Sequence, residues 1–502
     1  MKNNLLDFKK FTMNNKKNII TLFVISVLIY SYRMFFINTG IDNEVLTNSF
    51  IGARYAWYTI GRWGLNISKY LLYLNKMYNP YYIYILTILF FTMSSILFSY
   101  TISKIINKKN EENKIVLIFG LLYLTSPLYA EMFHFTMLSA EVALAFFLIS
   151  LSFYTSYRYI YIGDNKMGIF SILLLTYSFG SYQAFFPFAI LLAVSMFLLE
   201  LFFDKNLGKK YFKPIIKHIA IFLISFIVYS IISKIITTYL KSSPAYLTNQ
   251  IMWFKVGFRE SINQILDYMV SVFIPFNSVH FNFGYLLFSI LAVIISVNNA
   301  VRRKKIMELL CVVIVVFSPF IMCIIQGSAL PVRTQYMLPF ASIILVIYSY
   351  FNLKNIKIKS LLLVLTILIG VFQFKATSDL FYSDQVKYEE DKYVLSSIVN
   401  EANSKYDLSK KELIFVGIWE PKSTGVEVEG ETLARSFFIW DLGGPVSIND
   451  RVCAFSKTLG FDYKCATIKN YKKAQKVAKN MDIYPNGNCM KEEENYIVVK
   501  LK

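Results

Sequence analysis

Long apolar segments recur along the first 375 residues of the chain, and they constrain its fold more than any other feature. A helix that crosses the hydrocarbon core of a bilayer, about 30 Å thick, needs about 20 apolar residues. The chain is 56% hydrophobic and 17% charged, with a mean hydropathy of +0.47, which excludes a water-soluble or disordered protein. The sequence therefore predicts a polytopic α-helical membrane protein with about eleven spans, at residues 19–37, 81–103, 115–129, 136–157, 168–180, 184–203, 218–240, 284–299, 306–325, 337–353 and 360–375.

The net charge of +20 belongs to the apolar part of the chain. Residues 1–375 hold 34 basic and 13 acidic side chains, whereas residues 376–502 hold 18 and 19. The excess therefore indicates membrane topology, and no nucleic-acid partner is expected. Every second loop lies on the same predicted side of the membrane. The set that starts with residues 1–18 carries 23 Lys and Arg residues, whereas the set between them carries eight.

The positive-inside rule then predicts a multi-pass protein of the cytoplasmic membrane with a cytoplasmic N-terminus and an extracytoplasmic C-terminus. The first apolar stretch is full length and lacks a small-residue cleavage site, so we expect it to act as a signal anchor.

Residues 376–502 are predicted to form a separate extracytoplasmic α/β domain, and residues 1–375 the multi-span domain. The expected strands are Glu412–Trp419 and Asn495–Leu501, and the expected helices are Gln385–Tyr406 and Asn470–Met481. This domain contains Cys453, Cys465 and Cys489, which allow one disulfide without indicating which pair forms it.

Polar residues gather after the first span. Asp42 and Glu44 follow it directly, and Arg54 and Arg62 lie further along in the stretch 48–78, which is predicted to be one helix lying along the membrane interface. Ionisable groups near a membrane usually mark a site. The alternative for Arg54 is an ordinary interfacial anchor. For the two acids this alternative is weaker, because carboxylates gain nothing from anionic headgroups.

Five other residues expected on the outer side are candidates for substrate binding: Glu131, His134, Tyr182, Gln183 and Arg333. A lone histidine is more often structural. Tyr182 and Gln183 lie in a predicted hairpin turn between two spans, where they could simply satisfy the backbone. Arg333 precedes a span, and it could either extend to the interface or bind a lipid phosphate.

Motifs for soluble nucleotides and for the common hydrolases are missing from the sequence: it has no P-loop, no GxGxxG after a strand, no GxSxG and no HExxH. No cytoplasmic loop exceeds about 18 residues. An enzyme of this kind would need an activated substrate that reaches the outer face without a soluble nucleotide, and a polyprenyl-linked donor meets that condition. No cofactor is indicated, and the sequence neither demands nor excludes a metal.

Three short motifs resemble the type II Gtr membrane glucosyltransferases, which act in bacterial surface-polysaccharide glucosylation. They are Ile41-Asp42-Asn43-Glu44 with Gly61-Arg62-Trp63, then Gly180-Ser181-Tyr182-Gln183-Ala184, and finally Tyr484-Pro485-Asn486-Gly487 with the closing strand. The resemblance implies a GT-C-like glycosyltransferase that uses a sugar, expected to be glucose, on polyprenyl phosphate. It also implies an inverting displacement with Asp42 as general base. The family tends to have two adjacent acids here, whereas this chain has Asn43 between Asp42 and Glu44, so Glu44 is a candidate for the second.

The resemblance also implies the partners: the lipid-linked donor, a surface-polysaccharide acceptor, the bilayer, and a companion flippase with a donor-synthesising enzyme. The acceptor could be O-antigen, teichoic acid or a capsule. The rival functions are a transporter or flippase of lipid-linked sugars, a polysaccharide polymerase, and a non-enzymatic envelope scaffold. Transporters often contain internal repeats and midplane polar residues, and polymerases usually have one large outer loop between spans. The sequence contains neither feature, which favours glycosyl transfer.

Overall fold

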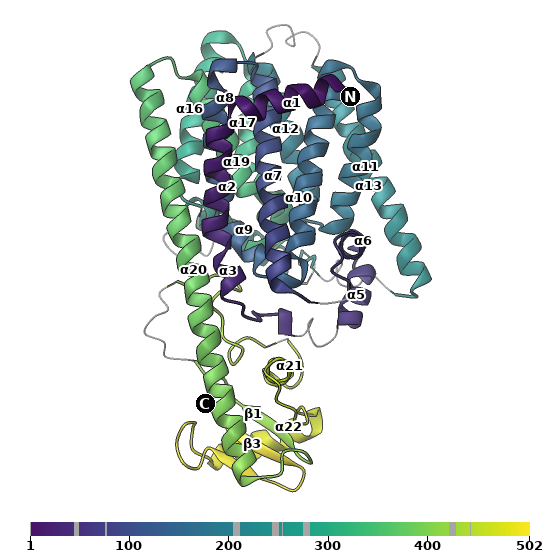
Figure 1. The fold of residues 1–502 in the computed structure, drawn as a ribbon, viewed down its shortest axis with the longest axis vertical. Coiled ribbons are helices and arrows are strands. Elements are labelled where there is room, and N and C mark those ends of the chain that lie inside the picture. The colour runs from purple at the N-terminus through teal and green to yellow at the C-terminus, as the bar shows by residue number, and fades with distance from the viewer. Residues whose placement is uncertain are drawn as a thin grey trace. The chain divides into compact units, whose positions relative to one another are not determined.

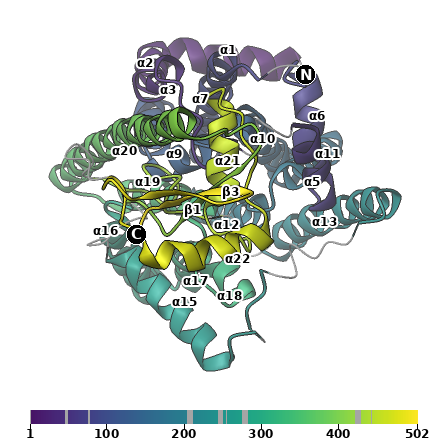
Figure 2. The same ribbon diagram turned by 90° about the horizontal axis from the view of Figure 1, so that it is seen from below.

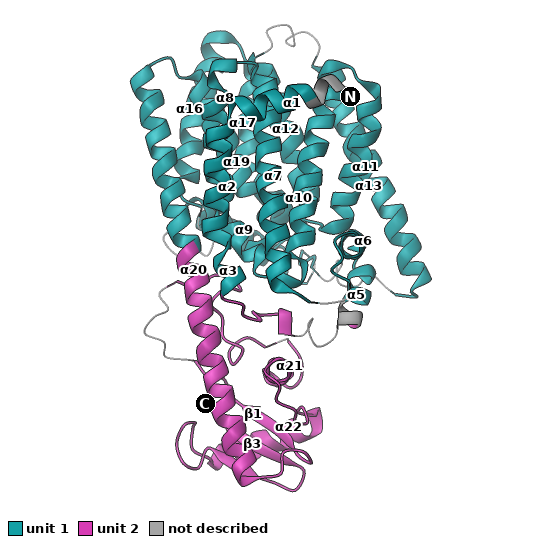
Figure 3. Cartoon of the chain, in the orientation of Figure 1, with its two compact units in different colours: residues 1–35, 54–377 teal, residues 36–53, 378–502 magenta. Residues whose placement is uncertain are grey.

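The structure is a computed structural model that describes residues 2–44, 50–75, 78–203, 211–242, 250–253, 255–274, 282–420, 428–441 and 443–502. Its contacts divide the chain into two compact units (Figure 3). The first, here called the membrane unit, comprises residues 1–35 and 54–377. The second, the C-terminal unit, comprises residues 36–53 and 378–502. The predicted multi-span domain, residues 1–375, includes residues 36–53, which the contacts group with the C-terminal unit.

Helices make up almost all of the regular structure before residue 378 (Figure 1). They are α1 Lys2–Asn14, α2 Lys16–Tyr30, α3 Tyr32–Phe35, α5 Phe50–Thr59, α6 Trp63–Leu71, α7 Pro80–Ile106, α8 Glu112–Leu124, α9 Pro127–Phe133, α10 Thr136–Tyr157, α11 Asn165–Ser181, α12 Phe185–Phe203, α13 Phe212–Tyr239, α15 Phe258–Phe273, α16 Tyr285–Arg303, α17 Ile306–Phe317, α18 Ile321–Gln326, α19 Met337–Asn352 and the start of α20 Ile356–Lys405.

Each predicted span coincides with a helix or a pair of helices. Within the described part of the chain, seven helices are long and apolar enough to cross a membrane, or eight if the bent pair α8–α9 is one span. The protein is therefore a helical membrane protein, and the count of eleven spans stays a prediction. The bend of 51° between α8 and α9 occurs at Thr125–Ser126, directly before Pro127. Proline lacks the N–H that would continue the helix, and it favours the first helical position.

Aromatic side chains fill the core of the membrane unit. The Phe91 ring on α7 lies 4.6–6.0 Å, between ring centroids, from five other rings, those of Tyr30, Tyr123, Tyr129, Phe133 and Phe146. Four of these five contacts are edge-to-face, the arrangement that suits the quadrupole of an aromatic ring. This packing joins α2, α7, α8, α9 and α10 into one body.

The predicted hairpin between two spans is confirmed. Helix α11 ends at Ser181 and α12 begins at Phe185. Tyr182 is extended, and the Phe185 N–H donates to the Tyr182 carbonyl at 3.1 Å, which closes the turn. The prediction of one interfacial helix over residues 48–78 is wrong. Two helices, α5 and α6, are separated at Gly61, which has φ +76°, and most of α6 is buried.

The C-terminal unit contains a three-stranded sheet in the order β1–β3–β2. Strands β1 Glu412–Val416 and β3 Tyr496–Lys500 pair in parallel, and β2 Met490–Glu492 is antiparallel to β3. Helix α22 Ile468–Val477 packs on β1 and β3 (Figure 2). Both predicted strands are present, and both predicted helices occur as the end of α20 and as α22. Helix α21 Asn449–Thr458 and strand β2 were not predicted.

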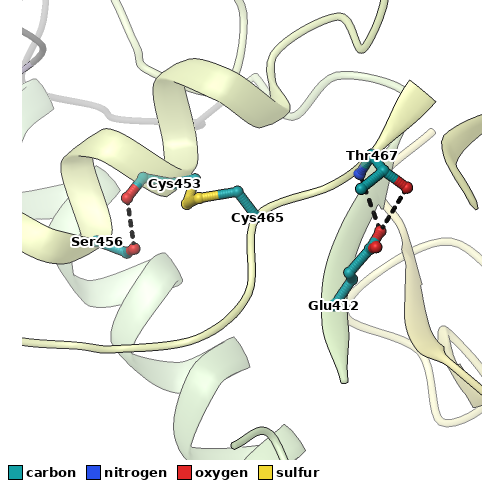
Figure 4. The surroundings of a disulfide bond; sticks show 5 residues. All are labelled: Glu412, Cys453, Ser456, Cys465 and Thr467. Carbon is teal, nitrogen blue, oxygen red and sulfur yellow. Dashed lines mark hydrogen bonds between the residues drawn. A yellow bond between two sulfur atoms is a disulfide. The ribbon is translucent and has the colours of Figure 1, made fainter. Parts of the chain in front are cut away.

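A disulfide joins Cys453 on α21 to Cys465, and Cys489 is a buried free thiol (Figure 4). The structure thus selects one of the pairings that the sequence left open. Near Cys465, the Glu412 carboxylate accepts hydrogen bonds from the backbone N–H and the hydroxyl of Thr467, at 2.9 and 3.2 Å. These bonds attach the segment after the disulfide to β1.

Candidate functional site

Asp42 lies in a tight turn within the C-terminal unit. Both Gly40 and Asp42 have positive φ, at 61° and 72°, and the Asn43 N–H donates to the Gly40 carbonyl at 3.2 Å. Glycine adopts this conformation freely, and aspartate tolerates it better than most residues. The turn directs the Asp42 side chain outward enough to leave 41% of it exposed.

Two residues fix this turn to the C-terminal unit. Ile41 is 1% exposed and belongs to the apolar core that the end of α20, β1 and β3 share. The Asn38 amide donates to the Asp384 carboxylate at 2.8 Å and to the Gln385 side chain at 3.4 Å, both on α20. The segment that follows the first span is therefore an integral part of this unit.

Arg451 on α21 bridges the two predicted acids. Its Nη2 lies 3.0 Å from Asp42 Oδ1, and its Nη1 lies 2.5 Å from Glu44 Oε1. The side chains of Arg451 and Glu44 are 2% and 0% exposed. The sequence pattern does not reveal Arg451, because this residue lies about 400 positions from the two acids in a helix without a chemical signature.

Asp42 and Glu44 differ in burial, and they therefore differ in their chemistry. Burial raises the pKa of the Glu44 carboxyl to about 7, even though the Arg451 guanidinium lowers it, and the charge on Asp42 raises it further. Glu44 is thus buried, and it keeps a proton to a higher pH than an ordinary carboxyl does. Asp42 is the acid of this pair that is accessible to a substrate.

A second group of predicted residues meets in the membrane unit. Arg62 Nε donates to Gln183 Oε1 at 2.9 Å, and its guanidinium carbon lies 4.2 Å from the centre of the Tyr182 ring. The Gln183 amide in turn donates to the Ile60 carbonyl at 2.8 Å. Arg62, Tyr182 and Gln183 therefore form one cluster, which joins the start of α6 to the α11–α12 hairpin.

Small residues allow this close approach. A Cβ at Gly64 would lie 2.6 Å from Ser181 Oγ and 2.8 Å from the Gly180 backbone, and a Cβ at Gly180 would overlap the Trp63 indole. A Cβ at Gly61 would lie 2.7 Å from the Tyr229 hydroxyl. The glycines of both motifs are thus required by packing, and they set the position of Arg62.

Arg62 and Arg333 line one pocket of about 80 Å³. The other described residues that line it are polar or apolar, with no acid among them: Tyr182, Gln183, Ala184, Pro187, Gln250, Met322, Gln326, Leu330, Pro331 and Thr334. Within the described parts of the chain, the Arg62 guanidinium has no carboxylate partner, and Gln183 is the only residue that accepts a hydrogen bond from it. Two cations beside apolar side chains favour an anionic ligand that carries an apolar group.

The other predicted residues lie elsewhere in the membrane unit. Arg54 donates to Asn66 at 3.3 Å and to the Tyr70 hydroxyl at 2.5 Å, and it stacks on the Tyr70 ring. Glu131 and His134 are fully buried. The His134 ring lies 3.3 Å from Arg33, which is itself buried. None of these three predicted residues lines the pocket of Arg62 and Arg333.

The structure also contains a buried ion pair that the sequence does not predict. Lys69 Nζ lies 2.7 Å from Glu141 Oε1, with the side chains 2% and 0% exposed, and it is 5.2 Å from the Trp57 ring. Lys69 lies in the stretch that the sequence predicts to be an interfacial helix, because the burial of α6 cannot be inferred from its composition. The described residues include no group of three or more His, Cys, Asp or Glu side chains that could hold a metal ion.

A comparison with protein families identifies a match. A family model described as Glucosyl transferase GtrII matches residues 30–350, which is more than half of the chain. The matched region contains Asp42, Arg62, the hairpin and Arg333, and it ends before Arg451. Comparisons with curated proteins and with solved structures gave no significant match.

Gly180→Ala is expected to destabilise the protein by about 1–3 kcal/mol, the usual cost of overpacking a filled core. The added methyl group would collide with the Trp63 ring. The measurement is thermal unfolding in detergent. Trp63→Leu in the same chain should recover part of the loss, and Gly487→Ala, where a Cβ meets nothing within 4 Å, should have no effect. Equal effects at Gly180 and Gly487 would contradict this packing.

Glu44 should make the protein less stable as the pH rises from about 4.5 to 7. Its pKa is about 7 in the folded protein and 4.5 for the free side chain, so in this window only the unfolded chain releases the proton. Its stabilising contribution is complete below pH 4.5 and is lost as the pH rises through 7. Melting temperatures between pH 4.5 and 8 should fall less in Glu44→Gln than in the wild type, and Glu429→Gln is the exposed control. Identical pH profiles for the wild type and Glu44→Gln would refute the assignment.

Proposed function

The chain belongs to the GtrII glucosyl transferase family and is therefore a glycosyltransferase, and from this premise we propose its donor, its acceptor and its mechanism. The donor is a sugar, glucose by the description of the family, linked to polyprenyl phosphate. The acceptor is a cell-surface polysaccharide. The pocket of Arg62 and Arg333 carries the proposal, because it brings two cations and an apolar wall together, and the phosphate and lipid of a lipid-linked sugar require both.

The proposed reaction is a single displacement. Asp42 takes the proton of an acceptor hydroxyl, the hydroxyl oxygen attacks the anomeric carbon, and the bond from that carbon to the phosphate oxygen breaks. The donor phosphodiester carries one negative charge, and the departing polyprenyl phosphate acquires a second. Arg62 and Arg333 are proposed to stabilise that growing charge. One displacement inverts the anomeric configuration.

Asp42 is proposed as the general base because it is the exposed member of the acid pair, with 41% of its side chain accessible. Glu44 is fully buried, which favours a supporting role over direct contact with substrate. Arg54, Glu131 and His134 are given no step, because each is engaged elsewhere within the membrane unit.

The extracytoplasmic face is proposed for the reaction. The hairpin and the loop that contains Arg333 both belong to the set of loops with few basic residues, which the positive-inside rule places outside. The disulfide in the C-terminal unit supports the same side, because disulfides persist in oxidising compartments.

Purified protein mixed with a synthetic polyprenyl-phosphate sugar and an acceptor glycan should release polyprenyl phosphate. Asp42→Asn should lower the turnover by about 10²–10⁴-fold, the usual effect of losing a general base. Wild-type turnover in a well-folded Asp42→Asn variant would exclude Asp42 as the base. Transport of the intact donor across vesicles without release of polyprenyl phosphate would instead identify a flippase.

Arg62→Ala should raise the KM for the donor and lower kcat together. The same guanidinium would bind the donor phosphate and stabilise the charge that develops on it, and removing one such donor typically costs about 10²–10³-fold in kcat. Steady-state kinetics over a range of donor concentrations measure both constants. Arg302→Ala, an exposed arginine at the end of α16, is the matched control and should leave both unchanged. A variant at Arg62 with wild-type constants would remove this pocket from the mechanism.

A further inference from the structure

The C-terminal unit supplies the residue that holds the proposed base. Arg451 lies beyond residue 350, where the family match ends, yet it contacts both acids of the turn that follows the first span. All three residues belong to the same compact unit. The contact therefore does not depend on how the two units are arranged.

We propose that Arg451 is a positioning residue for glycosyl transfer, which holds Asp42 in the orientation that accepts the proton of the acceptor hydroxyl. The proposal rests on the proposed function, in which Asp42 is the general base. It gives a role in catalysis to a residue of α21, a helix that lies beyond the residues matched by the family model.

The geometry leaves part of Asp42 available. Arg451 contacts Oδ1, and no described residue donates a hydrogen bond to Oδ2 of this half-exposed side chain. One oxygen is thus held while the other can accept a proton. A carboxylate fixed on one side keeps its remaining oxygen in a constant place, which is what a general base needs, since a misplacement of about 1 Å can cost about 10²-fold in rate.

Glu44 holds Arg451 from the other side. A buried arginine requires an opposite charge, and Glu44 at 2.5 Å supplies one that is itself fully buried. The rigid, planar guanidinium can face two carboxylates at once, whereas the ammonium of a lysine is a single flexible point of charge. The order Glu44, Arg451, Asp42 therefore runs from the interior of the unit to its surface.

The helix that carries Arg451 is attached on both sides of that residue. Asn449 donates from its side-chain amide to the Phe415 carbonyl at 2.8 Å, and its side-chain oxygen accepts the Phe415 N–H at 2.7 Å. Cys453, two positions after Arg451, forms the disulfide with Cys465. These attachments to β1 and to the following segment fix the backbone from which the Arg451 side chain extends.

The test compares kcat and KM in the full-length protein. Arg451→Gln is expected to lower kcat by about 10²-fold and to change the donor KM by less than about threefold, because the base is misplaced while the donor pocket is untouched. Arg451→Lys, which keeps the charge, should fall between Arg451→Gln and the wild type. Arg435→Gln removes another arginine of the same unit, paired with Glu429 at the surface, and should retain wild-type kinetics.

A double variant separates positioning from a general structural role. If Arg451 acts through Asp42, then adding Arg451→Gln or Arg451→Lys to Asp42→Asn should not lower the residual rate further. An additional loss of the same size in the double variant would overturn the proposal, and so would wild-type kcat in both single Arg451 variants. If Arg451→Gln does not fold, judged by its melting transition and by an intact Cys453–Cys465 disulfide, Arg451→Lys provides the same comparison.

A failure of the proposed function can be distinguished from a failure of the positioning role of Arg451. Wild-type turnover in Asp42→Asn would reject the proposed base, and with it the role of Arg451. A slow Asp42→Asn beside a fully active Arg451→Gln would reject the positioning role alone and leave the proposed function intact.

Discussion

A charge removed from water must face an opposite charge or a hydrogen-bonding partner, and this requirement governs where the polar residues of this protein lie. In the membrane unit it pairs Lys69 with Glu141 at 2.7 Å. In the C-terminal unit it places Arg451 against Glu44 and Asp42. Breaking such a buried pair by removing one partner typically costs about 3–5 kcal/mol. Arg62 differs, because it meets an amide and an aromatic ring and no carboxylate among the described residues. A cation held in this way can bind an external anion without first giving up a partner.

The hydropathy of the sequence is sufficient to predict the long apolar helices, but not α1, α15 or α21. Each span follows from a run of apolar residues, and the hairpin at Tyr182 follows from a run too long for one helix. The burial of α6 could not be predicted, because Trp63, Asn66 and Lys69 are typical of an interface when they are considered alone. Their environment depends on α10 and α11, which are distant in sequence. Short-range patterns specify the helices, and long-range packing decides which of their faces are buried.

In the candidate site, too, short-range patterns predict some features and long-range packing decides the others. Arg62, Tyr182 and Gln183 were selected separately and meet in the structure, because their motifs contain the glycines that permit contact. Asp42 was expected to share one site with Arg54 and Arg62 because all three follow the same span. The contacts group Asp42 with the C-terminal unit and both arginines with the membrane unit, and a shared site stays a prediction. Ile41, buried in the core of the C-terminal unit, is the physical reason, and nothing near it in the sequence reveals that core.

The contact between Trp63 and Gly180 has a consequence for the history of the family. The indole occupies the space that any side chain at position 180 would need, although the two residues are 117 positions apart. A relative with a larger residue at position 180 would therefore require a smaller one at position 63, and neither change would be tolerated first without a loss of packing. The two motifs, which were noticed independently, should accordingly diverge as a coevolving pair. Substitutions in one of them would then be informative about the other even in relatives of unknown structure.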